Sequence, residues 1–515
     1  MSPRTVVLRS VLVASLCAFL FGFDTGTIGS VTTMESFKQH FGDIDEVLRG
    51  LVVAIILLPS ALSGIFAGAC ADKISRKYTI ALGSGIFAVG SAISCACPPR
   101  LAVLFVARCV AGLGEGLFLG TLTVYIAEIS PPHTRGKNML LCQLFISSAI
   151  AIGFFTCYGS VKIASSLAWR LPFAISTLVS LVVVASAPFL PHSPRWLLLV
   201  GRRDEAERVL DALVGDSNPQ ERRDLLNAGP PVVGSRRAAF LRIWKKDVRR
   251  RTFLGIFLNV FQQLSGIDFV LFFAPLLFTQ AGLDPSTASF IASGVTGIVL
   301  VVVTIVGSTY IDKIGRRPLF IYGGAVVAGS QLLLGVMYAS GANKGGGRWF
   351  IIILIEVLAA GFSASWALVV RLYSSEIQPS RTRAAAASFS QASNQATNFI
   401  VAMTGPSFLT TNSGPYWTYG VLSLFAVIVA TFTMPETIGS SLEDIETKFQ
   451  SSSSATVVKL PAVFRRVVGG TEEVRRRRSS RKESQTLPGE TRAEFRAQVE
   501  LSKLGHKIDE EAVQG

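Results

Sequence analysis

Apolar runs of membrane-spanning length alternate with short polar connectors along most of this chain. About 20 residues of α-helix cross the hydrocarbon core of a bilayer, so each run predicts one transmembrane helix. The runs cover residues 6–28, 51–70, 78–97, 101–125, 139–159, 169–190, 253–281, 288–311, 319–339, 349–372, 384–409 and 416–434. We therefore expect an all-α membrane protein with twelve transmembrane helices, six in each of two halves.

One long polar stretch, residues 191–251, separates the two halves. Within it, apolar residues recur with helical period at Ala206, Val209, Leu210 and Leu213. This pattern predicts one or more short helices at a membrane surface; the alternative is a disordered linker. The expected parts are an N-terminal half at 1–190, a cytoplasmic central loop at 191–251, a C-terminal half at 252–435 and a largely disordered cytoplasmic tail at 436–515.

Composition favours an integral membrane protein over a soluble one. Half of the 515 residues are hydrophobic, 16% are charged, and the mean hydropathy is +0.48. A net charge of +15 would suggest nucleic acid in a soluble chain, but here the cations lie in loops between apolar runs, so no nucleic-acid partner is expected. The seven cysteines lack metal-ligand spacing, and we expect neither a metal nor a cofactor.

Lysine and arginine concentrate in the short loops on one side of the predicted helices. These residues are Lys73, Arg76, Lys77, Arg135, Lys137, Lys313, Arg316, Arg317, Arg381 and Arg383. The bias of such residues toward the cytoplasm predicts that both termini and the central loop are cytoplasmic. A basic cluster in the tail, residues 475–478, could bind anionic lipid, or could be a solvated charge run without a function.

The two halves repeat each other in these loops. The sequence Asp-Lys-Ile-Ser-Arg-Lys at 72–77 recurs as Asp-Lys-Ile-Gly-Arg-Arg at 312–317. The sequence from Glu128 to Arg135 recurs with the same internal spacing from Glu376 to Arg383. Parallel repeats of six helices are the architecture of major facilitator transporters, in which the substrate site lies between the halves.

Specific motifs extend this likeness to one family. They are Gly22, Asp24 and Gly26; the loops at 72–77 and 312–317; Arg108, Gly112 and Gly114; residues 128–136; Gln143 and Leu144; Trp169 and Arg170; residues 191–195; Gln262, Gln263 and Gly266; and Pro435, Glu436, Thr437 and Gly439. On these residues the chain resembles the sugar porter family of the major facilitator superfamily over residues 6–449, and it looks most like the fungal members.

Asp24 and Arg108 are charged residues inside predicted transmembrane helices, where a charge costs ~2.5 to 3.5 kcal/mol on insertion scales. The resemblance implies that Asp24 carries the coupling proton and that Arg108 is its counter-ion. The alternative is a structural ion pair without a proton cycle. Glu115 lies two helical turns beyond Arg108 and could supplement or compete for it.

A hydroxylated substrate needs amide and hydroxyl groups in a dry cleft, because buried polar groups must be hydrogen-bonded. The candidate binding residues are Gln143, Gln262, Gln263, Asp268, Asn394 and Asn398. We expect the helix after Gln263 to break or bend near Gly266.

The chain departs from the family pattern at several site positions. Asp268 replaces an asparagine, Phe272 a tyrosine, Leu300 an asparagine, Arg371 a tryptophan and Gln395 an aromatic residue, while Leu368 and Val370 replace paired prolines. Groups of a glucose site are therefore missing. Asp268 and Arg371 could form a second charge pair, or Arg371 could extend to the cytoplasmic surface.

Charged residues at the cytoplasmic helix ends are the candidate gate. They are Asp72, Arg76, Glu128, Arg135, Asp312, Arg316, Arg317, Glu376 and Arg383. Ion pairs among them would lock the halves together and break when the inner gate opens. The alternative is that the cations only set orientation, and Ser75 departs from the glycine expected at the first tight turn.

The expected function is secondary active transport of a sugar, polyol or similar compound across the plasma membrane, by proton symport with alternating access. The chain is expected to work as a monomer in the bilayer. A proton-independent facilitator, a metabolite exporter and a non-transporting nutrient sensor are the alternatives. An enzyme is not expected, since the sequence has no nucleotide-binding loop, HExxH motif or serine elbow.

Overall fold

The computed structural model describes residues 3–214, 243–245, 248–284, 288–341, 346–378 and 382–437, and every regular element in these ranges is helical. The first half contains α1 (Pro3–Thr33), α2 (Glu35–Phe41), α3 (Glu46–Ala54), α4 (Leu57–Ile74), α5 (Arg76–Cys95), α6 (Leu101–Ile129), α7 (Pro132–Ser160), α8 (Leu167–Ser186) and η1 (Ala187–Phe189). Two short helices follow, α9 (Pro194–Leu199) and α10 (Arg203–Val214). The second half contains α13 (Arg249–Gln263), α14 (Ile267–Phe272), α15 (Ala274–Gln280), α16 (Ala288–Ile314), α17 (Arg316–Ala339), α18 (Gly347–Ala364), α19 (Trp366–Glu376), α20 (Arg383–Leu409) and α21 (Gly414–Thr433).

The expected all-α membrane fold is confirmed. Within the described ranges, 11 spans are long and apolar enough to cross a bilayer. The twelfth predicted span is α20, which has 27 residues but carries serine, asparagine and glutamine side chains that lower its hydropathy. Several of these side chains, including Asn394, Gln395 and Asn398, are at most 2% exposed, so they face the protein interior rather than lipid.

Three of the described spans consist of more than one α-helix. The span Glu46–Ile74 is divided into α3 and α4 at residues 55–56, and the other two are interrupted at Gly266 and Ser365. Gly266 has φ +70°, in the left-handed region, and it separates α13 from α14, as the sequence predicts. Ser365 separates α18 from α19. Broken backbone at membrane depth is tolerated where it is covered by protein, and the breaks at Gly266 and Ser365 lie among buried residues.

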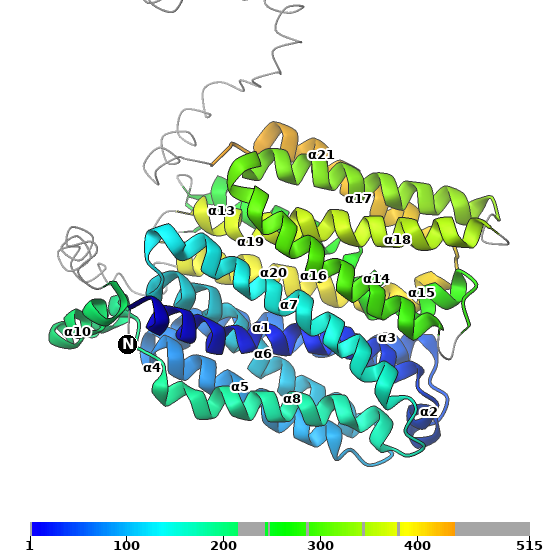
Figure 1. Cartoon of the computed structure of the whole chain (residues 1–515), viewed down its shortest axis with the longest axis horizontal. Helices are drawn as coiled ribbons and strands as arrows, with labels where there is room; N and C mark the ends of the chain where they lie inside the picture. The colour runs from blue at the N-terminus through cyan, green and yellow to red at the C-terminus, as the bar shows by residue number, and fades with distance from the viewer. Residues whose placement is uncertain are drawn as a thin grey trace, which may run out of the picture. The chain divides into compact units, whose positions relative to one another are not determined.

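The two halves lie side by side, with α1 and α4 to α8 in one and α13 to α21 in the other (Figure 1). Between them, α7 packs against α16, and both α3 and α4 pack against α20. Within a half, close helix contacts depend on small residues. A Cβ atom at Gly83 in α5 would lie 2.7 Å from the backbone oxygen of Gly114 in α6, which only glycine allows.

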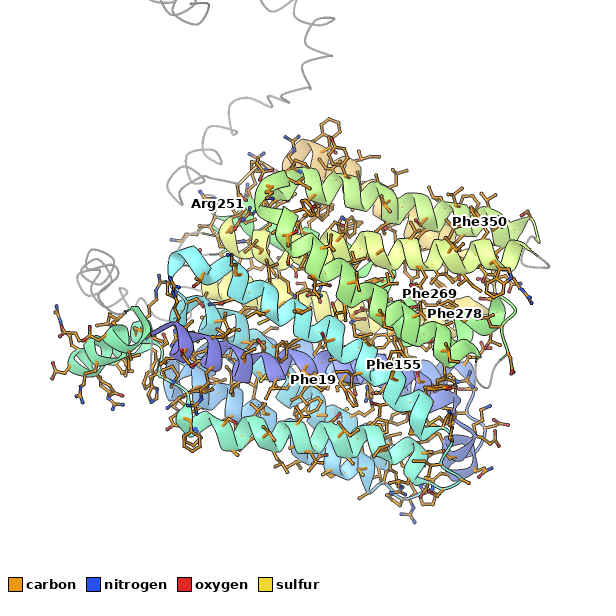
Figure 2. The ribbon with its side chains drawn as sticks, viewed as in Figure 1. Phe19, Phe155, Arg251, Phe269, Phe278 and Phe350 are labelled. Atoms are coloured by element: carbon orange, nitrogen blue, oxygen red, sulfur yellow. The ribbon has the colours of Figure 1, made fainter. Side chains whose placement is uncertain are left out.

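Large side chains fill the interior of the bundle and also cover its lipid-facing surface. Phe269 and Phe278 are at most 1% exposed, whereas Phe350, near one end of the second half, is 49% exposed (Figure 2). Exposed apolar side chains of this kind would be unfavourable in water. They are the expected surface of a protein whose outer helix faces contact hydrocarbon.

The predicted amphipathic helix in the central polar stretch is α10, and it packs on α9 through Trp196, Leu197 and Ala206. The hydroxyl of Ser193 caps α9 by accepting a hydrogen bond from the backbone N–H of Trp196 at 3.3 Å. Residues 215–242 and the tail from 438 onward, with its basic cluster, lie outside the described residues. The boundaries of the four expected parts remain a prediction.

Candidate functional site

Asp24 in α1 and Arg108 in α6 form a bidentate ion pair inside the first half. The Arg108 Nη1 and Nη2 atoms donate to the two Asp24 carboxylate oxygens at 2.9 and 3.0 Å. Arg108 Nη2 also donates to the Val53 carbonyl in α3 at 3.2 Å. The two side chains are almost fully buried, and each charge is therefore stabilised by the other.

A second buried carboxyl, Glu115, links the two halves. Its Oε1 atom accepts hydrogen bonds from Ser60 Oγ in α4 at 3.1 Å and from Gln395 Nε2 in α20 at 2.9 Å. Gln395 Nε2 also donates to Ser60 Oγ at 3.1 Å. Gln395 stands where the family often has an aromatic residue, and here its amide joins α20 of the second half to α4 and α6 of the first.

The amides expected to bind substrate hold one another in a compact network. Gln263 Nε2 donates to Asn394 Oδ1 at 3.0 Å, and Asn394 Nδ2 donates to Gln262 Oε1 at 3.0 Å. Gln262 Nε2 donates to the Trp366 carbonyl at 3.0 Å, at the start of α19. The network fixes α13, α19 and α20 relative to one another, which orients the glutamine side chains.

A central cavity of about 50 Å³ lies between the halves. Its lining comes from α1 and α7 in the first half and from α13, α14, α16, α18 and α19 in the second. Four candidate binding residues border it: Gln143, Gln262, Gln263 and Asp268. Asn394 and Asn398 are not lining residues but bond to residues that are. Asn394 bonds Gln262 and Gln263, and Asn398 Nδ2 donates to Asp268 Oδ2 at 2.5 Å.

A second cavity, of about 90 Å³, opens beside the first, toward the helix ends that carry the charged loops. Residues of α6, α7, α13, α19 and α20 line it. Gln143, Ala367 and Arg371 border both cavities, so they stand between the centre of the protein and this end. Within the described residues, no ion pair within 4.0 Å joins Arg371 to Asp268, although the two side chains border the same cavity and attract each other electrostatically. Which of the two expected arrangements holds stays a prediction.

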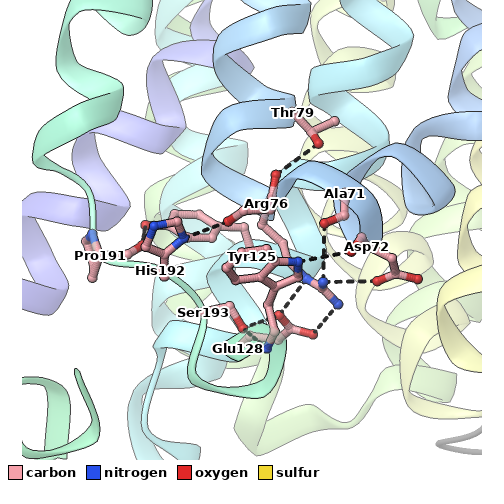
Figure 3. A network of polar contacts seen from close by, with 11 residues as sticks. Ala71, Asp72, Arg76, Thr79, Tyr125, Glu128, Pro191, His192 and Ser193 are labelled. Atoms are coloured by element: carbon pink, nitrogen blue, oxygen red, sulfur yellow. Dashed lines mark hydrogen bonds and ion pairs between the residues drawn. The ribbon is translucent and has the colours of Figure 1, made fainter. Parts of the chain in front are cut away.

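The first-half copy of the candidate gate surrounds Arg76 (Figure 3). Arg76 Nη1 lies 3.0 Å from Asp72 Oδ1, and Arg76 Nε lies 3.0 Å from Glu128 Oε2. Glu128 Oε2 also accepts from Ser193 Oγ at 2.5 Å, and Tyr125 Oη donates to the Pro191 carbonyl at 2.9 Å. The network thus connects the start of the central polar stretch, at Pro191 and Ser193, to the ends of α4, α5 and α6.

The second-half copy repeats this geometry with different residues. Arg316 Nη2 lies 3.4 Å from Glu376 Oε1, and Thr437 Oγ1 donates to Glu376 Oε2 at 2.8 Å. Glu436 accepts from the backbone N–H groups of Arg316 and Arg317 at 3.1 and 3.0 Å. The side chain of Arg317 donates instead to the Thr431 carbonyl at 2.6 Å.

The structure reveals a third internal repeat that the sequence reasoning missed. Tyr373 Oη donates to the Pro435 carbonyl at 2.9 Å, as Tyr125 does to Pro191 in the other half. In both halves the tyrosine lies three residues before the gate glutamate, Glu128 or Glu376. The proline lies two residues before Ser193 or Thr437, whose hydroxyl bonds that glutamate. That spacing was a usable signal, although the prolines are far from the tyrosines in sequence.

The turn at Ser75 keeps the conformation of its glycine counterpart. Ser75 has φ +90° and Gly315 has φ +99°. A serine in this region of backbone space is strained by ~1 to 3 kcal/mol. The Ser75 hydroxyl bonds His192 Nδ1 at 2.8 Å, which ties the turn to the segment before α9.

The gate contacts described above each remain within one half and the segment that follows it. They therefore do not themselves form the expected lock between the halves. The structure describes the backbone but not the side chains of Arg135, Asp312 and Arg383, so the gate as a whole stays a prediction. Side-chain hydrogen bonds that cross between the halves include those of Gln395 with Glu115 and Ser60, and that of Ser147 Oγ with Thr304 Oγ1 at 2.9 Å.

Comparison with known proteins agrees with this geometry. The sequence model of the family described as "Sugar (and other) transporter" matches residues 10–449. Probable polyol transporter 6 of Arabidopsis thaliana is 33% identical over 474 residues, covering 86% of this chain and 94% of its own length. The arabinose-proton symporter of Escherichia coli K12 is 29% identical over 446 residues, covering 85% of this chain and 92% of its own.

A solved structure gives the same result for the fold. The proton:xylose symporter of E. coli, bound to 6-bromo-6-deoxy-D-glucose, superposes with a TM-score of 0.75 at 26% identity, covering 86% of this chain and 99% of that one. The helices and their two-half arrangement define a multi-pass membrane transporter of the major facilitator superfamily.

The chain belongs to the sugar transporter family. The relatives named above are transporters, not enzymes. The expected affinity with fungal members stays a prediction.

Proposed function

We propose that this chain moves a sugar, a polyol or a similar small hydroxylated compound across the plasma membrane together with protons, by alternating access. The observation that carries the proposal is the buried pair of Asp24 and Arg108, in the half that also borders the central cavity through α1 and α7. The names of two relatives, an arabinose-proton symporter and a proton:xylose symporter, support the same activity.

In the proposed cycle, Asp24 binds the proton and Arg108 neutralises Asp24 when the proton has left. Protonation of Asp24 removes one charge of the pair and weakens the two bonds that hold Arg108. Because Arg108 also bonds the Val53 carbonyl, its release changes a contact between α6 and α3. α3 packs against α20 of the other half, so the proton site is connected to the interface that must rearrange.

The substrate lies in the central cavity in this proposal. Its hydroxyl groups bond the side chains of Gln143, Gln262, Gln263 and Asp268, which border the cavity. Asn394 and Asn398 hold Gln262, Gln263 and Asp268 in position rather than contacting substrate in this conformation. The two copies of the gate then act at the inner end, where both termini and the central loop face the cytoplasm.

The transporter works as a single chain with no nucleic-acid partner in this proposal, since both halves of the site come from one polypeptide. Substrate-dependent proton entry into proteoliposomes is the direct test, with labelled hexoses, pentoses and polyols as solutes. Solute flux that does not depend on the proton gradient would indicate a facilitator. Flux directed outward would indicate an exporter. Binding without any flux would indicate a sensor, and each of these three results contradicts the proposal.

A further inference from the structure

Arg371 in α19 is a cation at the centre of the protein that makes no direct ion pair in the described part of the chain. Its side chain borders both cavities. Asp268 borders the central cavity as well and attracts Arg371 from beyond ion-pair distance. Within the described part of the chain, the Arg371 guanidinium makes no ion pair within 4.0 Å, and it lies over the Phe21 ring, whose centroid is 6.0 Å from Cζ. A charge at this depth is unfavourable unless something pairs with it.

The acidic residues nearby are held by other groups. Asp24 is bonded through both oxygens to Arg108, and Glu115 accepts bonds from Ser60 and Gln395. Asp268 shares the central cavity with Arg371, but its Oδ2 atom is bonded to Asn398 at 2.5 Å. The cavity lining therefore includes a cation and an anion that make no direct ion pair with each other within the described residues.

We propose that the substrate is a hydroxylated carboxylic acid whose carboxylate pairs with Arg371 while its hydroxyls bond Asp268 and the neighbouring glutamines. A guanidinium presents parallel N–H donors that match a carboxylate, which makes arginine suited to this group. Asp268 adds an acceptor for hydroxyl hydrogens. This inference rests on the proposed function and specifies the substrate class of the same cavity.

Charge in the cavity favours a monoanion over a phosphate ester. A phosphate carries close to two negative charges near neutral pH, and Asp268 on the same cavity would repel it more strongly than it repels a carboxylate. The position of Arg371 between the cavities also matters. A substrate leaving the central cavity for the second cavity, at the end with the charged loops, passes the same guanidinium, so the anion stays paired along the path.

Matched pairs of solutes test the inference on the purified full chain. D-glucuronate and D-glucose differ only in a carboxylate against a hydroxymethyl group, and D-gluconate and D-sorbitol form an acyclic pair. We expect at least one acid to bind at least tenfold more tightly than its neutral partner by calorimetry, and glucose 6-phosphate to bind more weakly than glucuronate. Tighter binding of the neutral members, tighter binding of the phosphate, or binding of no member of either pair overturns the inference.

Variants separate pairing with the substrate from a structural role. Arg371→Gln should weaken binding of the acid by roughly 30-fold, equivalent to about 2 kcal/mol, and should change binding of the neutral partner by less than about threefold. Arg371→Lys keeps the charge, so it should retain the preference for acid even where Arg371→Gln folds poorly. Arg348→Gln is the control, since Arg348 lies over the Trp349 ring at the start of α18 and outside both cavities.

Two further results would contradict the inference. If Arg371 only balances Asp268, Arg371→Gln would weaken acid and neutral ligands equally, and adding Asp268→Asn would restore both. Proton measurements distinguish this failure from failure of the proposed function. Flux of a neutral sugar with protons would refute the carboxylate while supporting symport, whereas flux of the acid without protons would support the carboxylate and refute symport.

Discussion

At the scale of single residues, Asp24 offers the sharpest test of coupling. Asp24→Asn keeps the size of the side chain but removes the titratable charge. If Asp24 carries the proton, this variant should lose accumulation of substrate against a gradient and keep exchange or downhill flux. Counterflow and gradient-driven uptake in the same proteoliposomes measure the two activities.

A purely structural pair predicts a different outcome for the same variant. Removing the carboxylate would leave Arg108 without its partner at a site where it is 1% exposed. Breaking a buried pair costs ~3 to 5 kcal/mol in soluble cores, so the variant would then be poorly folded. Asp24→Asn with Arg108→Gln should in that case restore expression. A well-expressed Asp24→Asn protein that still concentrates substrate with protons would refute the coupling role.

His192 gives a prediction about pH. Burial and the nearby positive charge of Lys77 lower the pKa of His192 below its usual value of 6.5, although Glu205 acts in the opposite direction. The unfolded chain then binds the proton more readily than the folded one, so stability is full above the unfolded pKa and falls as pH drops below it. We expect the melting temperature of the purified protein to fall between neutral and mildly acidic pH.

The same histidine supplies the control for that experiment. Its ring stacks on Trp196, with centroids 5.0 Å apart, and bonds the hydroxyl of Ser75. His192→Gln keeps a polar group near Ser75 but does not titrate. The variant should lose part of the acid-dependent decrease in melting temperature, and an unchanged pH profile would show that other groups cause it.

At the scale of helices, the contact of α20 with α4 and α6 predicts an effect on the balance between conformations. Gln395→Leu removes the side-chain amide that donates hydrogen bonds to Glu115 and Ser60 in the other half. A lost hydrogen bond of this kind is worth roughly 1 kcal/mol, or about a fivefold change in a population ratio. We expect conformations in which α20 has moved away from α4 to become more populated, measured by the accessibility of single cysteines placed at each end of the cavities.

Thr397→Val is a matched control on the same helix. Its hydroxyl donates to the Ser393 carbonyl at 2.8 Å, which is a bond within α20 and not between the halves. This variant should leave the accessibility pattern unchanged. Equal effects of the two substitutions would show that α20 responds to any loss of polarity and that the bond to Glu115 has no special part in the balance.

At the scale of the whole molecule, the repeated networks allow the gate to be tested. Glu128→Gln removes the charge that pairs with Arg76 at a site about 10% exposed, whereas Glu376→Gln removes the charge that lies 3.4 Å from Arg316 at a site 26% exposed. We expect losses of about 2 kcal/mol and about 1 kcal/mol in stability, since better-buried pairs are more costly to break. Thermal unfolding of the purified variants measures both.

The double variant decides whether the networks act together. Contacts described here lie within separate halves, and distant independent sites give additive effects. An additive loss for Glu128→Gln with Glu376→Gln would mean that each network fastens its own half. A loss well above or below the sum would show coupling between the halves, as the gate hypothesis requires.

Local sequence by itself determined where the helices are. Length and apolarity of a run decide whether it can cross a bilayer, and these are properties of neighbouring residues. For the same reason the helical period at Ala206 to Leu213 predicted α10, and Gly266 predicted the break after α13. The sequence also predicted α20 as a transmembrane helix, from its length and its place in the repeat. Its polar side chains nevertheless place it outside the 11 apolar spans of the described residues.

Tertiary structure alone decided which polar side chains meet. Whether Gln395 faces lipid, its own half or Glu115 depends on how α20 is rotated, and that rotation is set by packing against α3, α4 and α13, which are far away in sequence. The bonds from Tyr125 to Pro191 and from Tyr373 to Pro435 likewise join distant segments. The environment of Arg371 likewise depends on distant segments, because only the assembled halves enclose the cavity that Arg371 and Asp268 both border.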